Sequence, residues 1–274
     1  PEPTSPSKEL RPPTTAPETP QHILLAPPKT LRGLIPNDTD IVESFRSVDA
    51  QFACEHRGVR CGTTATSVYI GYDPVSDTWD VKCGWAGDSR AVLIEPDAKT
   101  FANLAIDHRI ENDAERERIN VAAKTDLLPN GTPRSYITRR QNSRGEYGPK
   151  AVFSGSTGIS HLMTRSIGDP HGAPALIPDA EIISKQGVAN GSWVVLASDG
   201  LWDVFDEAGV AKVVRSTRHP AHAARKLTLD SVARRRQYGM TADDVTVIVI
   251  ELTAPVIQPP ESRTSPSKVA DIDH

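Results

Sequence analysis

The chain has 274 residues, of which 38% are hydrophobic, 24% charged and 5% aromatic, and its formal net charge is −4. This composition is typical of a globular protein with a buried core and excludes collagen-like, coiled-coil and wholly disordered chains. A negative chain also lacks the basic field of a non-specific nucleic-acid or anionic-membrane binder, so neither partner is expected.

Proline divides the chain into a central part and two ends. Ten of the 23 prolines lie in residues 1–36 and four in residues 254–274, which leaves nine in the 217 residues between them. Such proline-rich ends have few large apolar side chains and cannot bury enough surface to offset the loss of chain entropy. We therefore predict a disordered tail over 1–36, one folded domain over 37–253 and a disordered tail over 254–274.

The first predicted element of the domain is an amphipathic helix. Asn37, Asp38 and Thr39 are good N-cap residues, and apolar side chains follow at spacings of three and four as far as Phe52. This pattern predicts a helix of about four turns.

Three strands are predicted next, at 64–72, 79–85 and 91–95, where apolar and β-branched residues are dense. The second and third of these runs flank the turn-forming sequence Gly-Asp-Ser-Arg at 87–90. The pattern therefore predicts a β-hairpin that carries Asp88 at its tip.

The middle of the domain has one helical pattern and one stretch without any. Residues 111–123 are helical in pattern, whereas the turn formers and charges of 131–149 predict a long surface loop. Two short basic groups, Arg139-Arg140 and Arg234-Arg235-Arg236, are predicted to be solvated faces.

Two apolar strands are predicted in the last part of the domain. Residues 193–197 are almost wholly apolar, and residues 245–252 have apolar side chains on both faces, which is typical of strands inside a layered structure. Helical patterns lie between them at 206–216 and 220–237, the second with Pro220 in its first turn.

The three cysteines, Cys54, Cys61 and Cys83, are odd in number and lack C-x-x-C spacing. They indicate buried structural thiols in a reducing compartment. No apolar run approaches the ~18 residues of a membrane-spanning helix, and no signal peptide is recognisable. We expect an intracellular protein, cytoplasmic or nuclear, that is a monomer.

Four aspartates stand at the ends or turns of apolar strands, where a carboxylate is unfavourable unless something binds it. They are Asp88, Asp199, Asp203 and Asp243. Gly200 permits a sharp turn, and a separation of four residues lets Asp199 and Asp203 face one point if the chain turns helically. An oxygen-only ligand set suits Mg²⁺ or Mn²⁺ rather than Zn²⁺. The alternative is that these aspartates only form turns and caps.

Six segments, taken in order, resemble the motifs of the metal-dependent type 2C (PPM family) serine/threonine protein phosphatases. They are CGTTAT (61–66), AGDSRAVL (86–93), DHRIENDAERERI (107–119), LMTRSIGD (162–169), VVLASDGLWDV (194–204) and ADDVTVIVI (242–250). The resemblance covers about residues 38–253. It implies an α+β fold, a four-layer α/β/β/α sandwich of two mainly antiparallel sheets flanked by helices. An unrelated α+β domain is a weaker alternative.

The resemblance also implies a site and a reaction. Asp199 and Asp243 would be ligands of a binuclear Mn²⁺ or Mg²⁺ centre, and Asp88 and Asp203 would help to hold a third ion. The expected substrates are phosphoserine and phosphothreonine in other proteins, hydrolysed by a metal-activated water without a phosphoenzyme. His108 is expected to be structural. Arg90 and Arg165 are expected to form structural ion pairs.

One diagnostic element of the family is not found in these 274 residues. It is an Asp-Gly-His-Gly-Gly turn that supplies a bridging aspartate and the histidine thought to act as general acid, and the phosphate-binding arginine precedes it. No catalytic residue is therefore assigned, and the fold is expected to be N-terminally incomplete. We expect a fragment or incomplete form of a phosphatase with poor activity; the alternative is an inactive relative that acts as a binding or scaffold module.

Overall fold

The computed structural model describes residues 35–56 and 61–255, and the tails predicted at 1–36 and 254–274 fall almost entirely outside this part of the chain. The helices are α1 (Asp38–Glu55), α2 (Asp113–Thr125), α3 (Asp199–Trp202), α4 (Glu207–Thr217) and α5 (Pro220–Gln237). The strands are β1 (Gly62–Thr63), β2 (Ala65–Asp73), β3 (Thr78–Ala86), β4 (Arg90–Ile94), β5 (Phe101–Asn103), β6 (Ser135–Gln141), β7 (Tyr147–Ser154), β8 (Ser160–His161), β9 (Ile167–Gly168), β10 (Glu181–Ala189), β11 (Ser192–Ala197) and β12 (Val247–Leu252).

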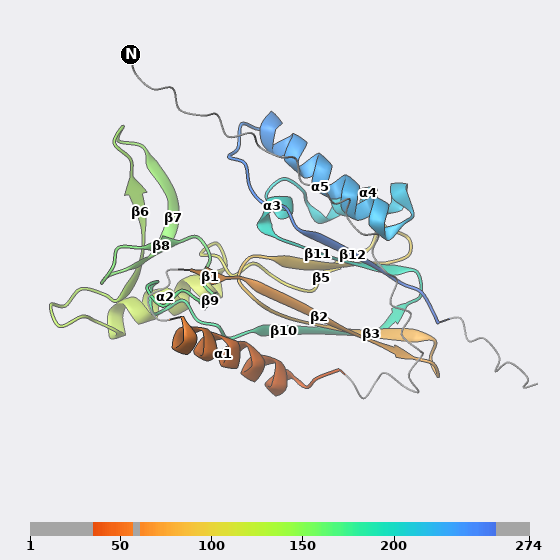
Figure 1. Ribbon diagram of the computed structural model, residues 1–274, viewed down its shortest axis with the longest axis horizontal. Coiled ribbons are helices and arrows are strands. Elements are labelled where there is room, and N and C mark those ends of the chain that lie inside the picture. Colours follow the sequence, from red (N-terminus) through yellow and green to blue (C-terminus); the bar gives the residue numbers. More distant parts are fainter. Residues whose placement is uncertain (1–34, 57–60, 256–274) are drawn as a thin grey trace, which may run out of the picture.

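The main body has four layers, as predicted (Figure 1). One sheet has the strand order β12-β11-β4-β5 and the other β10-β3-β2, and all of their pairings are antiparallel. Helices α4 and α5 cover the outer face of the first sheet, and α1 covers the outer face of the second. Apolar side chains of both sheets, among them Trp85, Leu93 and Val194, fill the space between them.

Helix α1 forms where the N-cap signal predicts it. The Asn37 side chain accepts a hydrogen bond from the Asp40 backbone N–H at 2.8 Å, which satisfies one of the free donors of the first turn. Ile41 and Phe45, four residues apart, lie on one helix face and are buried against the β10-β3-β2 sheet. None of the described helices is long and apolar enough to cross a membrane.

The predicted hairpin with Asp88 at its tip is wrong. Strand β3 pairs with β2 and β10, whereas β4 pairs with β11 and β5, so residues 87–89 connect the two sheets. Gly87 makes this crossing possible: its φ is +111°, and a Cβ there would lie 2.3 Å from Thr64 Cγ2. The apolar pattern identifies the two strands but does not identify their partners.

The predicted loop at 131–149 is also wrong, because this stretch contains most of a hairpin. Strands β6 and β7 pair in antiparallel register around a turn in which Asn142 and Glu146 bond each other and Gly145 has a φ of +83°. The turn formers therefore mark only the tip of the hairpin. Its charged strands project away from the sandwich (Figure 1), so their composition is like that of a loop.

Two burial predictions need correction. Strand β12 lies at an edge of its sheet and Ile248 is 51% exposed, so the strand is not buried on both sides within the described part of the chain. Cys83 is buried between the sheets, where burial raises the pKa of its thiol to about 12. Cys54 and Cys61 are exposed: Cys54 lies nine residues after Phe45 and so on the opposite face of α1, and Cys61 directly precedes β1.

Candidate metal centre

The register of one sheet gathers the four predicted aspartates at a single end. Ala197, the last residue of β11, lies opposite both Arg90 at the start of β4 and Val247 at the start of β12. Asp88 comes two residues before Arg90, and Asp199 two residues after Ala197. The residues that precede β4 and β12 and those that follow β11 therefore meet at the same edge.

Three of the aspartates form a close group. Carboxylate oxygens of Asp199, Asp203 and Asp243 lie within 4.8 Å of one another. Asp199 opens the short helix α3, and the Asp203 backbone N–H donates to the Asp199 carbonyl at 2.9 Å. The four-residue separation thus places both carboxylates on one side of a helical turn, as predicted.

Arg109 connects the fourth aspartate to this group. Its Nε donates to Asp88 Oδ2 at 2.8 Å and its Nη2 to Asp199 Oδ2 at 3.3 Å, while its Nη1 lies 3.7 Å from Asp203 Oδ1. Asp88 is the most buried of the four, with 4% of its surface exposed. Arg109 is not predicted from the sequence, because nothing in the spacing of the residues marks the position after Asp107-His108.

Arg235 is the second cation of the site. Its Nη2 donates to Asp203 Oδ2 at 2.9 Å and to Asp243 Oδ2 at 2.8 Å. Its prediction as part of a solvated face is wrong, since only 5% of its surface is exposed. A signal was present: Ala223, Leu227, Ser231 and Arg235 recur every four residues and form the buried face of α5.

The carboxylates disfavour each other's ionisation. Burial raises the pKa of Asp88, Asp199 and Asp203, and for Asp199 the nearby charges of Asp88 and Asp243 raise it further. The two arginines oppose these shifts without cancelling them. Four carboxylates and two guanidinium groups leave a formal charge of −2 at this edge of the sheet.

The residues present suit a hard divalent cation. All four acidic donors are carboxylates, and the described residues place no cysteine or histidine among them. Oxygen ligands of this kind are preferred by Mg²⁺ and Mn²⁺, and a charge of −2 can be neutralised by one such ion. Because both arginines occupy carboxylate oxygens, an ion entering the group must compete with or displace them.

Arg90 and Arg165 form ion pairs, as expected. Arg90 binds Asp107 through two hydrogen bonds of 2.9 Å and Glu207 through one of 2.7 Å.

Beside Arg90, a cavity of about 640 Å³ opens between Arg90, Arg109 and the start of α2. This cavity lies next to the acidic group, because Arg109 lines both.

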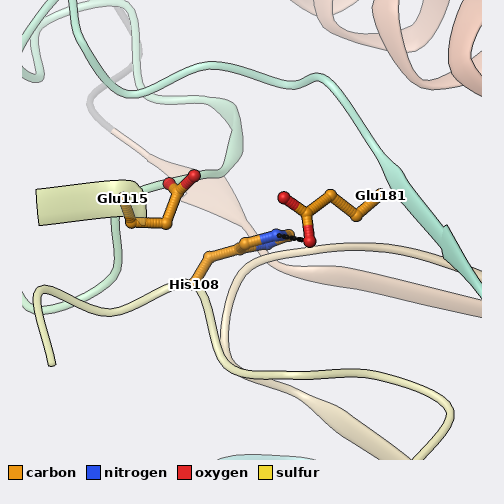
Figure 2. A group of neighbouring side chains, drawn as sticks. All are labelled: His108, Glu115 and Glu181. Atoms are coloured by element: carbon orange, nitrogen blue, oxygen red, sulfur yellow. Dashed lines mark ion pairs between the residues drawn. The ribbon is translucent and has the colours of Figure 1, made fainter. Parts of the chain in front are cut away.

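His108, Glu115 and Glu181 form a second group of possible metal ligands (Figure 2). Each of the three places one ligand-type atom within 4.8 Å of the others. The His108 ring is fully buried and stacks on Trp85 at a centroid distance of 5.5 Å. Its Nδ1 accepts the Gly87 backbone N–H at 3.1 Å, and its Nε2 lies 3.5 Å from Glu181 Oε2.

The donor chemistry of this second group does not fit a metal. Since Nδ1 of His108 accepts a hydrogen bond, a neutral ring carries its proton on Nε2 and has no lone pair there for an ion. Arg165 binds Glu115 at 2.6 Å and Glu181 at 2.7 Å, and Arg118 binds Glu115 at 2.7 Å. Two carboxylates are thus already neutralised by two arginines, and the group is structural.

Comparison with known proteins identifies the family of the chain. A family model described as Protein phosphatase 2C matches residues 29–127 and 153–239. The chain is 30% identical over 217 residues to a protein named Probable protein phosphatase 2C 3 from Oryza sativa subsp. japonica, and 31% identical over 198 residues to Probable protein phosphatase 2C 15 from Arabidopsis thaliana. These matches cover 78% and 71% of this chain and 39% of each relative.

Solved structures show the same fold. The crystal structure of a serine-threonine phosphatase 2C from Toxoplasma gondii matches 79% of this chain and 67% of its own, with a TM-score of 0.59 and 18% identity. The structure of a C. elegans sex determining protein matches 79% of this chain and 47% of its own, with a TM-score of 0.56 and 20% identity.

The chain therefore belongs to the protein phosphatase 2C family. The matching relatives are named protein phosphatases, and the family implies dependence on a divalent metal. The chain spans about two fifths of the length of the two curated relatives, 39% in each case.

Proposed function

We propose that Asp88, Asp199, Asp203 and Asp243 hold divalent ions, Mn²⁺ or Mg²⁺, and that the chain hydrolyses phosphoserine and phosphothreonine in other proteins. The observation that carries the proposal is the meeting of the carboxylates, three of them within 4.8 Å, at the sheet end where the family's motifs converge. When bound, the ions supply a water of lowered pKa and neutralise phosphoryl oxygens.

The chain's own residues would have three tasks in this reaction. Asp199 and Asp243, from the segments that flank β11 and β12, would hold the ions near the sheet end, with Asp88 and Asp203 beside them. Arg109 would release carboxylate oxygens to an ion and turn its guanidinium toward the phosphate, for which its planar donors are suited. Arg235, whose Nε donates to the Gly200 carbonyl oxygen, would keep Asp203 and Asp243 oriented.

The test is phosphate release from a phosphothreonine peptide with and without Mn²⁺. We expect a slow, Mn²⁺-dependent reaction, because the sequence does not contain the family's Asp-Gly-His-Gly-Gly turn. Asp199→Asn removes a charged ligand and should lower the rate about 100-fold or more, the usual scale for one electrostatic contributor.

A matched control is Asp230→Asn, which removes a carboxylate of α5 that pairs only with Lys226 among the described side chains. Its rate should equal that of the unchanged chain. Release that persists without Mn²⁺ or survives Asp199→Asn would contradict the metal assignment. Failure of the unchanged chain to release any phosphate would contradict the proposed activity.

A further inference from the structure

A groove separate from the acidic group lies between α2 and the β6–β7 hairpin. It encloses about 610 Å³, and we call it the hairpin groove. Its lining residues are Arg116 and Asn120 from α2 and Ile137, Thr138, Arg139, Tyr147 and Lys150 from the hairpin. Three of these seven residues are cationic and none is acidic.

The hairpin register explains how the groove forms. Ile137 pairs with Val152, and both pack on the apolar face of α2 around Ile119. Two pairs further toward the tip, and therefore on the same face of the hairpin, Arg139 lies opposite Lys150. The apolar pair fixes the hairpin on the helix, and the cationic pair projects beyond that contact.

Two like charges directly opposite each other on neighbouring strands repel. Neither Arg139 nor Lys150 forms an ion pair with any acidic side chain in residues 35–56 and 61–255, and both are exposed. Arg116 on the facing helix adds a third positive charge, which is only partly balanced by its exposed partner Asp113. The arrangement is unfavourable for the isolated chain and complementary to an anionic ligand.

The groove also offers apolar contact. Tyr147 is 64% exposed although it is a large aromatic residue, and it lines the groove together with Ile137. An exposed aromatic side chain among cations suits a peptide that carries both acidic and apolar side chains. A free inorganic anion would leave this apolar surface unused.

Helix α2 connects the groove to the acidic group. Asn112, Arg116 and Asn120 are spaced by four and lie on one helix face, about 12 Å from first to last. Asn112 lines the cavity beside Arg90 and Arg109, whereas Arg116 and Asn120 line the hairpin groove. An extended peptide covers this distance with about four residues.

We infer that the hairpin groove binds an acidic segment of a protein, a few residues from the point where that protein meets the acidic group. That the bound protein is a phosphorylated substrate rests on the proposed function; binding of the acidic segment does not. The groove would thus select among protein partners by the charge of the flanking sequence.

The test is fluorescence anisotropy with a labelled, unphosphorylated eight-residue peptide of Glu, Asp and one Leu, in EDTA and low salt. Arg139→Glu should weaken binding about fivefold or more, because it replaces an attraction by a repulsion. The variant should fold at least as well as the unchanged chain, since the introduced carboxylate can pair with Lys150 across the strands. Thermal unfolding checks this point independently.

The matched control is Arg144→Glu, an equal change of charge in the turn of the same hairpin, outside the groove lining. Its affinity should stay within twofold of the unchanged chain. Equal weakening by both variants, or no binding of the peptide, would overturn the inference. A single-stranded oligonucleotide of the same charge that binds more tightly would also overturn it, in favour of a nucleic-acid ligand. Because no metal or phosphate is present, these outcomes do not depend on the phosphatase assay.

Discussion

At the scale of single residues, His108 holds the turn that presents Asp88. Its backbone N–H donates to the Gly87 carbonyl at 3.0 Å and its Nδ1 accepts the Gly87 N–H at 3.1 Å, so one residue satisfies both backbone groups of Gly87. The next residue, Arg109, binds Asp88 itself. Burial, together with the charge of Arg165, lowers the pKa of His108 to about 4.

This lowered pKa predicts a loss of stability in acid. Between about pH 6.5 and 4 the unfolded chain binds a proton at His108 that the folded chain does not, so the free energy of unfolding falls as the pH falls through this window. We expect a loss on the order of 2 kcal/mol. His108→Asn keeps an acceptor for the Gly87 N–H but cannot titrate, so urea unfolding at pH 7, 6 and 5 should show a smaller loss for the variant. Equal losses would contradict the account.

At the scale of elements, the short helix α3 depends on Gly200. A Cβ at this position would lie 2.3 Å from the Asp244 carbonyl oxygen, which belongs to the segment that carries Asp243. The Gly200 carbonyl also accepts hydrogen bonds from Ser231 at 2.6 Å and Arg235 at 3.3 Å. Helix α3 is therefore fixed between the segment before β12 and helix α5.

Gly200→Ala should separate these elements. We expect a destabilisation of about 2 kcal/mol from overpacking and a weaker affinity for Mn²⁺, because Asp199 and Asp243 move apart. Gly148→Ala is the control, since the nearest atom to its Cβ is the Arg140 carbonyl oxygen at an ordinary 3.5 Å. Denaturant unfolding and Mn²⁺ calorimetry measure both effects; a Gly200→Ala variant as stable as Gly148→Ala would refute the role of close packing.

The elements also show what could be predicted from the sequence. Helix α1 begins at its predicted N-cap, and α4 and α5 begin and end within about one residue of their predicted bounds. Their signals are local: a cap, a spacing of three and four, or a proline in the first turn. Strand partners depend on the whole fold, so the crossing at Gly87 and the β6–β7 hairpin could not be read from local patterns. The four aspartates were predicted as a group; Arg109 reaches them only through tertiary structure.

At the scale of the whole molecule, two sheets and their helices hold an acidic group that the metal-free chain compensates only in part. Burial raises the pKa values of Asp88, Asp199 and Asp203, and the charges of Asp88 and Asp243 raise that of Asp199 further. At pH values above the usual carboxyl range, the folded chain therefore binds more protons at these groups than the unfolded chain does. Ionisation of these groups as the pH rises therefore destabilises the fold. Removal of one charge should stabilise the metal-free chain, modestly for Asp199, whose side chain is 38% exposed and screened by solvent.

The measurement that tests the central claim most directly is thermal unfolding at pH 7 in EDTA and in Mn²⁺, for the unchanged chain, Asp199→Asn and Asp230→Asn. Mn²⁺ at about ten times its Kd should raise the Tm of the unchanged chain and of Asp230→Asn by about 3 °C. Asp199→Asn should unfold about 1–3 °C higher than the unchanged chain in EDTA and gain nothing from Mn²⁺. An equal Mn²⁺-induced rise in Asp199→Asn, or no rise in the unchanged chain, would contradict the assignment of the acidic group as the metal centre.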